Sequence, residues 1–222
     1  MRSSPGRRAP RMQGGLAVVV LAGGTSRRLG PNKPLTQVGN RSMLAHAIMT
    51  ASTISDEVIV VAGDPLQETV YRKEIPAKVL VVHDKIHQRG PLVGLYTGLE
   101  KVNSHYAAVL PCDCPFVKKE VVLYLYGFAK GMDAAVPVWP DGKIEPLHCV
   151  FRAKPARKAA IEAMKAEMDT IREMIQQMDR VKFVSIEKIK EFDPALLTFL
   201  NINTPEDLER ARRILLELGS VE

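Results

Sequence analysis

The chain has 222 residues, of which 46% are hydrophobic and 25% charged, a composition that suits one α/β domain with a full apolar core. Its net charge of +6 comes largely from four arginines in the first fourteen residues; without them, 27 of the 31 basic side chains remain against 25 acidic ones. This nearly neutral body argues against a general nucleic-acid-binding surface, and the longest apolar run, residues 16–22, is too short to cross a membrane.

The first fifteen residues are rich in proline, glycine, serine and arginine and show no apolar periodicity. We therefore expect a disordered basic tail over residues 1–15, followed by a single domain over residues 16–222. The tail lacks the apolar centre of a secretory signal, and Met12 is a second candidate start. The three cysteines are an odd number and predict buried thiols in a cytoplasmic protein, rather than a zinc site beside His148.

A glycine-rich loop follows the first predicted strand, Leu16–Leu21, whose apolar, β-branched pattern is typical of a strand buried on both faces. Gly23 and Gly24 permit positive φ and let backbone N–H groups approach a bound oxygen. Arg28 and Lys33 add positive charge, so the segment predicts a phosphate cradle. The alternative interpretation is an ordinary strand-to-helix turn with solvated arginines.

This loop is neither a Walker loop, because Pro34 follows Lys33, nor a dinucleotide fingerprint, because its first two glycines are adjacent. Residues 21–33, Leu-Ala-Gly-Gly-Thr-Ser-Arg-Arg-Leu-Gly-Pro-Asn-Lys, instead resemble the signature of nucleotidyltransferases that attach a nucleotide to a small phosphorylated acceptor. Within that group the segment is most similar to the molybdenum cofactor guanylyltransferases. The resemblance implies a nucleotide site at Leu21, Ala22, Gly23, Gly24, Lys33, Asp84 and Asp113, with Lys33, Arg28 and Asp113 as the catalytic residues.

Strand and helix patterns alternate over residues 35–110, which predicts a parallel sheet with right-handed crossovers. The expected elements are a strand-like segment at 35–38, helix 43–52 capped by Ser42, strand 57–62, helix 66–73, strand 78–82, helix 91–102 and strand 105–110. Ligands of such sheets bind beyond the carboxyl ends of the strands, which predicts Gly23, Gly63 and Asp84 along one edge. The expected fold class is α/β, a three-layer, mostly parallel, Rossmann-like sheet with helices on both faces, like that of nucleotide-diphospho-sugar transferases.

The second half of the chain has a less regular pattern. The expected elements are helix 117–130, strands 133–138 and 143–151, two helices within 154–178 that separate near Thr170, strand 181–186, a strand-like segment at 199–203, and a final helix to about residue 218. Thr204 and Pro205 predict the start of that final helix. The methionines within 154–178 are typical of core filling rather than of a ligand set.

Asp113 is the strongest candidate for a metal ligand. Nucleotidyl transfer requires a bound triphosphate and a divalent cation, and Mg²⁺ prefers one or two carboxylates together with phosphate oxygens and water. Asp113 follows a predicted buried strand and lies between Pro111 and Pro115. The family resemblance, through Asp-Cys-Pro-Phe, implies that this aspartate binds Mg²⁺. The alternative interpretation is an Asx turn that only caps the next helix.

Four further residues complete the candidate site. The resemblance implies that Asp84 contributes to the nucleotide site, and the alternative is a surface turn acid. Residues 201–208, Asn-Ile-Asn-Thr-Pro-Glu-Asp-Leu, match a motif of the same family, in which a ligand of the metal or acceptor stands at this place. We therefore predict Asn201 and Asn203, together with Glu145, as acceptor-binding residues. Helix capping explains Thr204 but neither asparagine.

The resemblance predicts a cytoplasmic enzyme that transfers GMP from GTP to the phosphate of molybdopterin and releases pyrophosphate. Its expected partners are GTP, molybdopterin and proteins that make or receive the molybdenum cofactor, with neither nucleic acid nor a membrane among them. The alternatives are the same chemistry with CTP, or with cobinamide phosphate as acceptor, or a non-catalytic nucleotide-binding module. The base preference stays open because Val61-Ala62-Gly63 stands where some members carry a nucleotide-binding asparagine.

Overall fold

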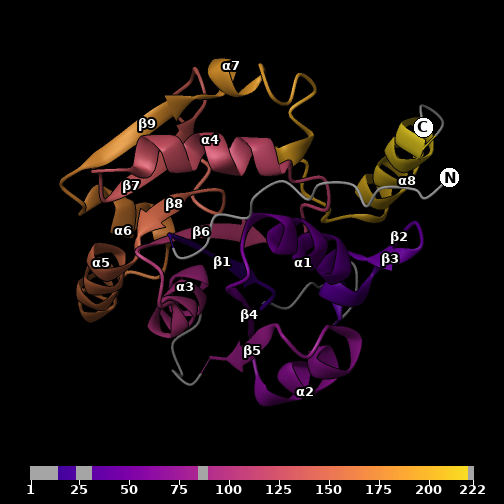
Figure 1. The fold of residues 1–222 in the computed structure, drawn as a ribbon, viewed down its shortest axis with the longest axis horizontal. Coiled ribbons are helices and arrows are strands. Elements are labelled where there is room, and N and C mark those ends of the chain that lie inside the picture. The colour runs from indigo at the N-terminus through magenta and orange to yellow at the C-terminus, as the bar shows by residue number, and fades with distance from the viewer. Residues whose placement is uncertain (1–14, 24–31, 85–89, 220–222) are drawn as a thin grey trace, which may run out of the picture.

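The computed structural model describes residues 15–23, 32–84 and 90–219. Within these residues seven strands form one sheet in the order β5-β4-β1-β6-β8-β7-β9, and β2 pairs with β3 in a separate hairpin (Figure 1). The strands are β1 (Leu16–Leu21), β2 (Gln37–Val38), β3 (Arg41–Ser42), β4 (Val58–Ala62), β5 (Leu80–His83), β6 (Tyr106–Pro111), β7 (Ala134–Val138), β8 (Val150–Arg152) and β9 (Val181–Ser185). The predicted α/β fold with a mostly parallel sheet is confirmed, since within the described chain only β8 runs antiparallel to its neighbours.

Helices cover both faces of the sheet, which gives the three expected layers. They are α1 (Met43–Ile54), α2 (Pro65–Glu74), α3 (Pro91–Lys101), α4 (Lys119–Ala129), α5 (Ala153–Lys165), α6 (Ile171–Gln176), α7 (Ile186–Ile189) and α8 (Pro205–Gly219), with 3₁₀ turns η1 (Lys33–Leu35) and η2 (Leu197–Phe199). One apolar cluster packs α1 and α4 against the sheet, and a second packs α3, α5 and α6 against the opposite face. The two groups of helices lie on opposite sides of the strands in Figure 1.

The central strand β1 shows why its sequence is a continuous apolar run. Leu16, Val18 and Val20 face the first cluster, while Ala17 and Val19 face the second, and all five are buried. Alternate side chains of a strand point to opposite faces, so a strand covered on both sides needs apolar residues at every position. β1 pairs in parallel with β4 on one side and with β6 on the other.

Up to β6, the predicted helices and the longer strands agree with the structure to within two residues at each end. Local signals explain this agreement. The Ser42 hydroxyl accepts a hydrogen bond from the N–H of Ala45 and begins α1, and Pro91 begins α3. The strand-like segment 35–38 is shorter than predicted, because Lys33–Leu35 forms a 3₁₀ turn and only Gln37–Val38 pairs as β2.

Of the strands predicted in the second half, one is shorter than predicted and one is wrong. Within residues 143–151 only the end belongs to β8, and Ile144 forms an isolated bridge with Val138, because His148 N–H donates to Glu145 O in a turn and Pro146 has no N–H for a ladder. Residues 199–203 form no strand; Leu196 has a left-handed φ of 52°, and the 3₁₀ turn η2 follows it. The predicted separation of α5 from α6 is confirmed, with Thr170 and Glu173 forming a capping box.

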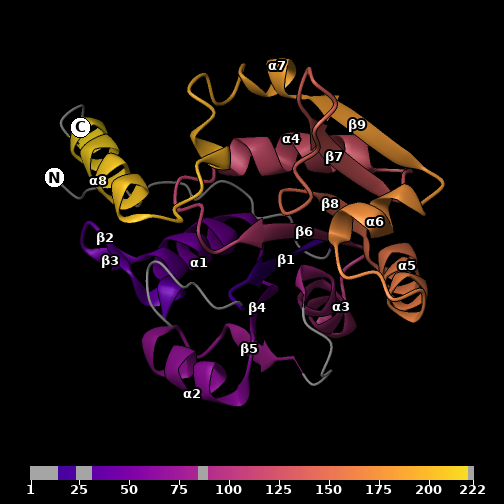
Figure 2. The same cartoon turned by 180° about the vertical axis from the view of Figure 1, so that it is seen from behind.

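The last helix lies at the side of the sheet, next to the β2–β3 hairpin, in both views (Figures 1 and 2). A small apolar cluster joins the two, through Val38 of β2, Ile202 and Ala211 of α8. The segment that leads into α8 also passes close to the end of β6, since Ile202 N–H donates to Asp113 O at 2.9 Å.

Candidate active site

The carboxyl ends of four parallel strands meet at one edge of the sheet. Ala22 N–H donates to Val61 O at 2.8 Å, Asp84 N–H to Ala62 O at 3.2 Å, and Cys112 N–H to Leu21 O at 3.1 Å. The backbone is crowded at Gly23, where an added Cβ would lie 3.1 Å from the Cα of Gly63. The structure therefore brings Gly23, Gly63 and Asp84 to the same edge, and glycine allows the first two to approach closely.

Lys33 connects three segments that are far apart in the chain. Its Nζ donates to Asp113 Oδ2 at 2.6 Å and to Asn203 Oδ1 at 2.7 Å. The Lys33 and Asp113 side chains are 12% and 19% exposed, so the ion pair is mostly shielded from water. A carboxylate oxygen and an amide oxygen thus converge on one cation at the end of β6. We call Lys33, Asp113 and Asn203 the lysine cluster.

Asp113 is held by its backbone as well as by its carboxylate. Its C=O accepts a hydrogen bond from Ile202 N–H, and its neighbours Cys112 and Cys114 are buried. Burial raises the pKa of both thiols, which keeps them neutral. The helix-cap alternative for Asp113 is wrong, because α4 begins at Lys119 without a side-chain cap and the Asp113 carboxylate bonds to Lys33 instead.

The start of α8 fixes Asn203. The Asp207 carboxylate accepts hydrogen bonds from the N–H groups of Asn203 and Thr204, both at 2.9 Å, and the first of these lowers the pKa of Asp207 most. The Thr204 hydroxyl in turn accepts from Asp207 N–H at 3.2 Å, as its capping role predicts. This backbone arrangement leaves the Asn203 side chain free to accept from Lys33. Asn201, two residues earlier, is exposed.

Asp84 lies at the end of β5 against helix α3. Its Oδ1 is buried and has no hydrogen-bond partner among the described residues. Burial raises the pKa of this carboxyl, while a hydrogen bond from the Thr97 side chain acts in the opposite direction. An added Cβ at Gly94 would lie 3.9 Å from Asp84 Oδ2. Asp84 is thus a partly buried carboxylate that faces α3 rather than a solvated turn acid.

Glu145 lies in the turn between β7 and β8 and does not contact the lysine cluster directly in the described structure. Its Oε1 accepts a hydrogen bond from Trp139 Nε1 at 2.6 Å. Its negative charge contributes to raising the pKa of Cys114, which places Glu145 near the residue that follows Asp113. Glu145 therefore lies on the β7 side of the lysine cluster.

Aromatic rings lie next to the turn that carries Glu145, and the sequence analysis missed them. Trp139 and His148 both pack against Phe199, with ring centroids 5.9 and 5.0 Å apart and the rings inclined at 65° and 68°. Burial lowers the pKa of His148 to about 4, so this ring is neutral at physiological pH. The three residues come from separate segments, and no local pattern in the sequence joins them.

Two of the predicted site residues, Gly24 and Arg28, lie outside the described residues. Leu21 and Ala22 of the same motif are described, at the end of β1. Among the described residues no group of three histidine, cysteine, aspartate or glutamate side chains is arranged to hold a metal ion. In the described chain no helix has the length and apolarity to span a membrane.

Comparisons with known proteins identify the family of this chain. Residues 18–181 match the family model described as "MobA-like NTP transferase domain". The chain is 36% identical over 200 residues to "Probable molybdenum cofactor guanylyltransferase" of Methanosarcina mazei, a match that covers 87% of this chain and 88% of the relative. It is 31% identical over 198 residues to "Molybdenum cofactor guanylyltransferase" of Desulfosudis oleivorans, covering 87% of this chain and 92% of the relative.

Solved structures give the same grouping. Molybdopterin-guanine dinucleotide biosynthesis protein A from Archaeoglobus fulgidus superposes with a TM-score of 0.79 at 27% identity, covering 90% of this chain and 99% of the other. A cytidylyltransferase of Thermus thermophilus that acts on 2-C-methyl-D-erythritol 4-phosphate shares the fold, with a TM-score of 0.66 at 19% identity and coverage of 89% and 98%. At that identity the second likeness concerns the fold alone.

Proposed function

Because the chain belongs to the family of MobA-like NTP transferase domains, we propose that it is a molybdenum cofactor guanylyltransferase, which transfers GMP from GTP to the phosphate of molybdopterin and releases pyrophosphate. The observation that carries this proposal is the lysine cluster. It places a cation, a carboxylate and an amide oxygen beside the strand ends that carry the glycine-rich motif. This is an arrangement that can bind a triphosphate and stabilise a leaving pyrophosphate.

The residues of the cluster fit a magnesium ion. Asp113 and Asn203 already direct oxygens at one cation, the ammonium of Lys33, and Mg²⁺ is commonly bound by one or two protein oxygens together with phosphate and water. Asp113 would hold the ion, with Asn203 beside it. When bound, Mg²⁺ would neutralise charge on the phosphate groups.

Lys33 has a second position in this proposal. When GTP enters, its ammonium would leave Asp113 and Asn203 and bind the phosphate oxygens, whose negative charge increases as pyrophosphate departs. The neighbouring N–H groups at the end of β1 would bind the same phosphates. Asp84, whose buried Oδ1 has no partner in the described structure, would accept a hydrogen bond from the nucleotide. This contact would offset the cost of burying that oxygen.

The acceptor would approach from the β7 side. We propose that Glu145, Asn201 and Asn203 bind molybdopterin there. Asn203 belongs to the lysine cluster, and Glu145 lies near Cys114. The acceptor phosphate would then attack the α-phosphate opposite the pyrophosphate. The reaction uses GTP, and all three cysteines are free and buried, so we propose the cytoplasm as its compartment.

A nucleotide panel tests this function. We expect GTP with Mg²⁺ to stabilise the protein more than ATP, CTP or UTP, by about 2.7 kcal/mol when GTP is at 100 times its dissociation constant. The measurement is the thermal shift with each nucleotide, followed by pyrophosphate release with molybdopterin present. A larger shift with CTP would replace the guanylyl assignment with a cytidylyl one. Binding without pyrophosphate release would favour the non-catalytic nucleotide-binding module.

A further inference from the structure

Helix α2 presents polar rather than apolar side chains to the sheet. Only Gln67 and Tyr71 are buried in this helix, whereas α1 buries seven residues that are mostly apolar. Glu68, which is half-buried, and Arg72, which is exposed, lie on the same helical face as these two residues. Packing of an apolar face does not explain this set, so its hydrogen bonds need an explanation.

Three of these side chains bind at the carboxyl end of a strand, and Arg72 binds within β5. Gln67 Oε1 accepts from Gly63 N–H at 2.9 Å, and the Tyr71 hydroxyl donates to Ala22 O at 3.0 Å. Tyr71 is fully buried, and burial raises its pKa, which keeps the hydroxyl proton in place. One helix thus holds the backbone that follows β4 and the backbone that follows β1.

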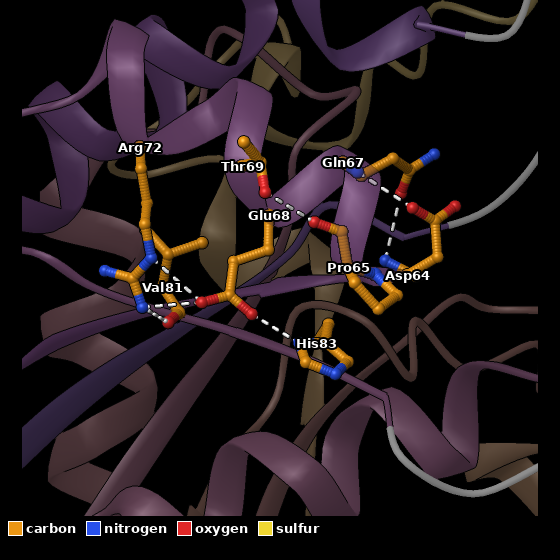
Figure 3. A network of polar contacts seen from close by, with 9 residues as sticks. Asp64, Pro65, Gln67, Glu68, Thr69, Arg72, Val81 and His83 are labelled. Carbon is orange, nitrogen blue, oxygen red and sulfur yellow. Dashed lines mark hydrogen bonds and ion pairs between the residues drawn. The ribbon is translucent and has the colours of Figure 1, made fainter.

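The other two side chains hold β5. Glu68 bonds to His83 Nδ1 through Oε2, and its Oε1 accepts from Arg72 Nη2 at 2.6 Å (Figure 3). Arg72 Nη2 also donates to Val81 O at 2.6 Å. His83 lies directly before Asp84, and its bond to Glu68 lowers the pKa of that glutamate. The glutamate therefore links α2 to the residue that precedes the proposed nucleotide carboxylate.

Together these contacts hold the carboxyl ends of β1 and β4 and two residues of β5, Val81 and His83, and reach no other strand in the described structure. These strands lead to Ala22, Gly63 and Asp84, the edge assigned above to the nucleotide. We propose that Gln67, Glu68, Tyr71 and Arg72 are positioning residues, through which α2 sets the strand ends to the spacing that a nucleoside triphosphate requires. This inference rests on the proposed function.

The experiment compares GTP affinity in paired variants. Tyr71→Phe removes the hydrogen bond to Ala22 O, and Glu68→Ala removes the link between α2 and His83. The control for the tyrosine is Tyr106→Phe, which removes a hydroxyl that accepts from Gly131 N–H at 3.0 Å at the other end of the sheet. The control for the glutamate is Glu162→Ala, which removes a surface ion pair with Lys165. Calorimetry with GTP and Mg²⁺, well below the melting temperatures, gives the dissociation constants. Steady-state kinetics gives KM and kcat.

We expect at least fivefold weaker GTP binding in Tyr71→Phe and Glu68→Ala, and values within twofold of wild type in both controls. KM for GTP should rise more than kcat falls, and KM for the acceptor should not change. A side chain that only stabilises the fold would lower the melting temperature and leave the dissociation constant unchanged. If Tyr71→Phe fails to fold, Glu68→Ala decides alone, because its side chain is partly exposed.

Two results would overturn the inference, and they differ in meaning. If wild type binds GTP and both α2 variants stay within twofold of it, the positioning role is wrong and the proposed function stands. If wild type binds none of the four nucleoside triphosphates, the proposed function fails first and the inference fails with it.

Discussion

The sheet has two halves that present polar groups in different ways. In the half formed by β5, β4, β1 and β6, all strands are parallel, and the groups at their carboxyl ends are fixed by backbone hydrogen bonds and by α2. In the half formed by β8, β7 and β9, one strand is antiparallel, and the polar groups come from irregular segments around Glu145 and Asn203. We propose that the first half binds the triphosphate, which all members of the reaction class share, and that the second half binds the acceptor.

The lysine cluster is where the halves meet, since Lys33 and Asp113 come from the first half and Asn203 from the segment that follows β9. We therefore expect substitutions in the first half to affect nucleotide binding and the chemical step. Substitutions in the second half should affect acceptor binding alone. Each of the following variants tests this division between the two halves.

The largest effect is expected for Asp113→Asn. The amide is isosteric and can still accept from Lys33, so the fold should persist, but the charge that would hold Mg²⁺ is lost. GTP- and Mg²⁺-dependent pyrophosphate release with molybdopterin should fall by about 10²–10³-fold, equivalent to about 2.7–4 kcal/mol of transition-state stabilisation. Asp141→Asn, at an exposed turn whose Oδ1 accepts from Lys143 N–H, makes the same chemical change as a control. Wild-type turnover in Asp113→Asn would refute the metal site.

Lys33→Met should have a similar effect on turnover, about 10²-fold, with an additional loss of GTP affinity. It should also change the protein without nucleotide. Because the ammonium no longer occupies the oxygens of Asp113 and Asn203, MgCl₂ alone should raise the melting temperature of this variant more than that of wild type. Equal shifts with MgCl₂ in the two proteins would show that Lys33 and the metal do not share these oxygens.

Glu145→Gln should raise KM for molybdopterin about tenfold, a loss of about 1.4 kcal/mol, because the acceptor loses a charged hydrogen-bond partner. The dissociation constant for GTP should stay at the wild-type value, since Glu145 belongs to the second half. Glu187→Gln on α7, which removes a surface pair with Lys190, is the matched control. If weaker GTP binding accompanies the change in KM, the proposed division between the two halves is wrong.

Asp84→Asn should raise the stability of the protein and weaken its binding of GTP. Burial raises the pKa of Asp84 above its unfolded value, so the ionised carboxylate is less favourable in the folded protein. The variant should therefore be more stable than wild type, and its advantage should grow as pH rises from the unfolded pKa to the raised pKa and vanish below the unfolded pKa. A gain of about 1 kcal/mol would raise the melting temperature by about 2–4 °C.

The same substitution should weaken GTP binding about fivefold, about 1 kcal/mol, because the amide cannot replace a charged acceptor. Thermal melts at several pH values and calorimetry with GTP measure the two effects. A variant that is no more stable than wild type at any pH would show that contacts in the folded protein, such as the hydrogen bond from Thr97, offset the cost of burying the Asp84 carboxylate.

The first half could be predicted from the sequence because its signals are local. Leu16–Leu21 is apolar at each position, and Ser42 and Pro91 begin helices by their own chemistry. The lysine cluster could not be predicted in the same way, because its contacts join residues 80 and 170 positions apart. The family resemblance identified the residues of the cluster but not the bonds between them.

The second half was predicted less well for a physical reason. The turn at Glu145–His148 interrupts a run that alternates well enough to indicate a strand, and only the tertiary position of Trp139 explains where Glu145 points. The polar face of α2 was missed as well. From the sequence alone, Gln67 and Arg72 resemble solvated helix residues. Only the structure shows that Gln67 binds Gly63 N–H and that Arg72 binds Val81 O.

The place of β1 in the sheet has a consequence for how the protein is made. β1 needs β4 on one side and β6 on the other, and β6 ends at Pro111, about 50 residues after β4. At a synthesis rate of 5–20 residues per second, the apolar strand β1 has one unpaired edge for roughly 2–10 s, until β6 is made. During that interval an unpaired strand can bind other chains, so the nascent protein should depend on chaperones most before β6 emerges.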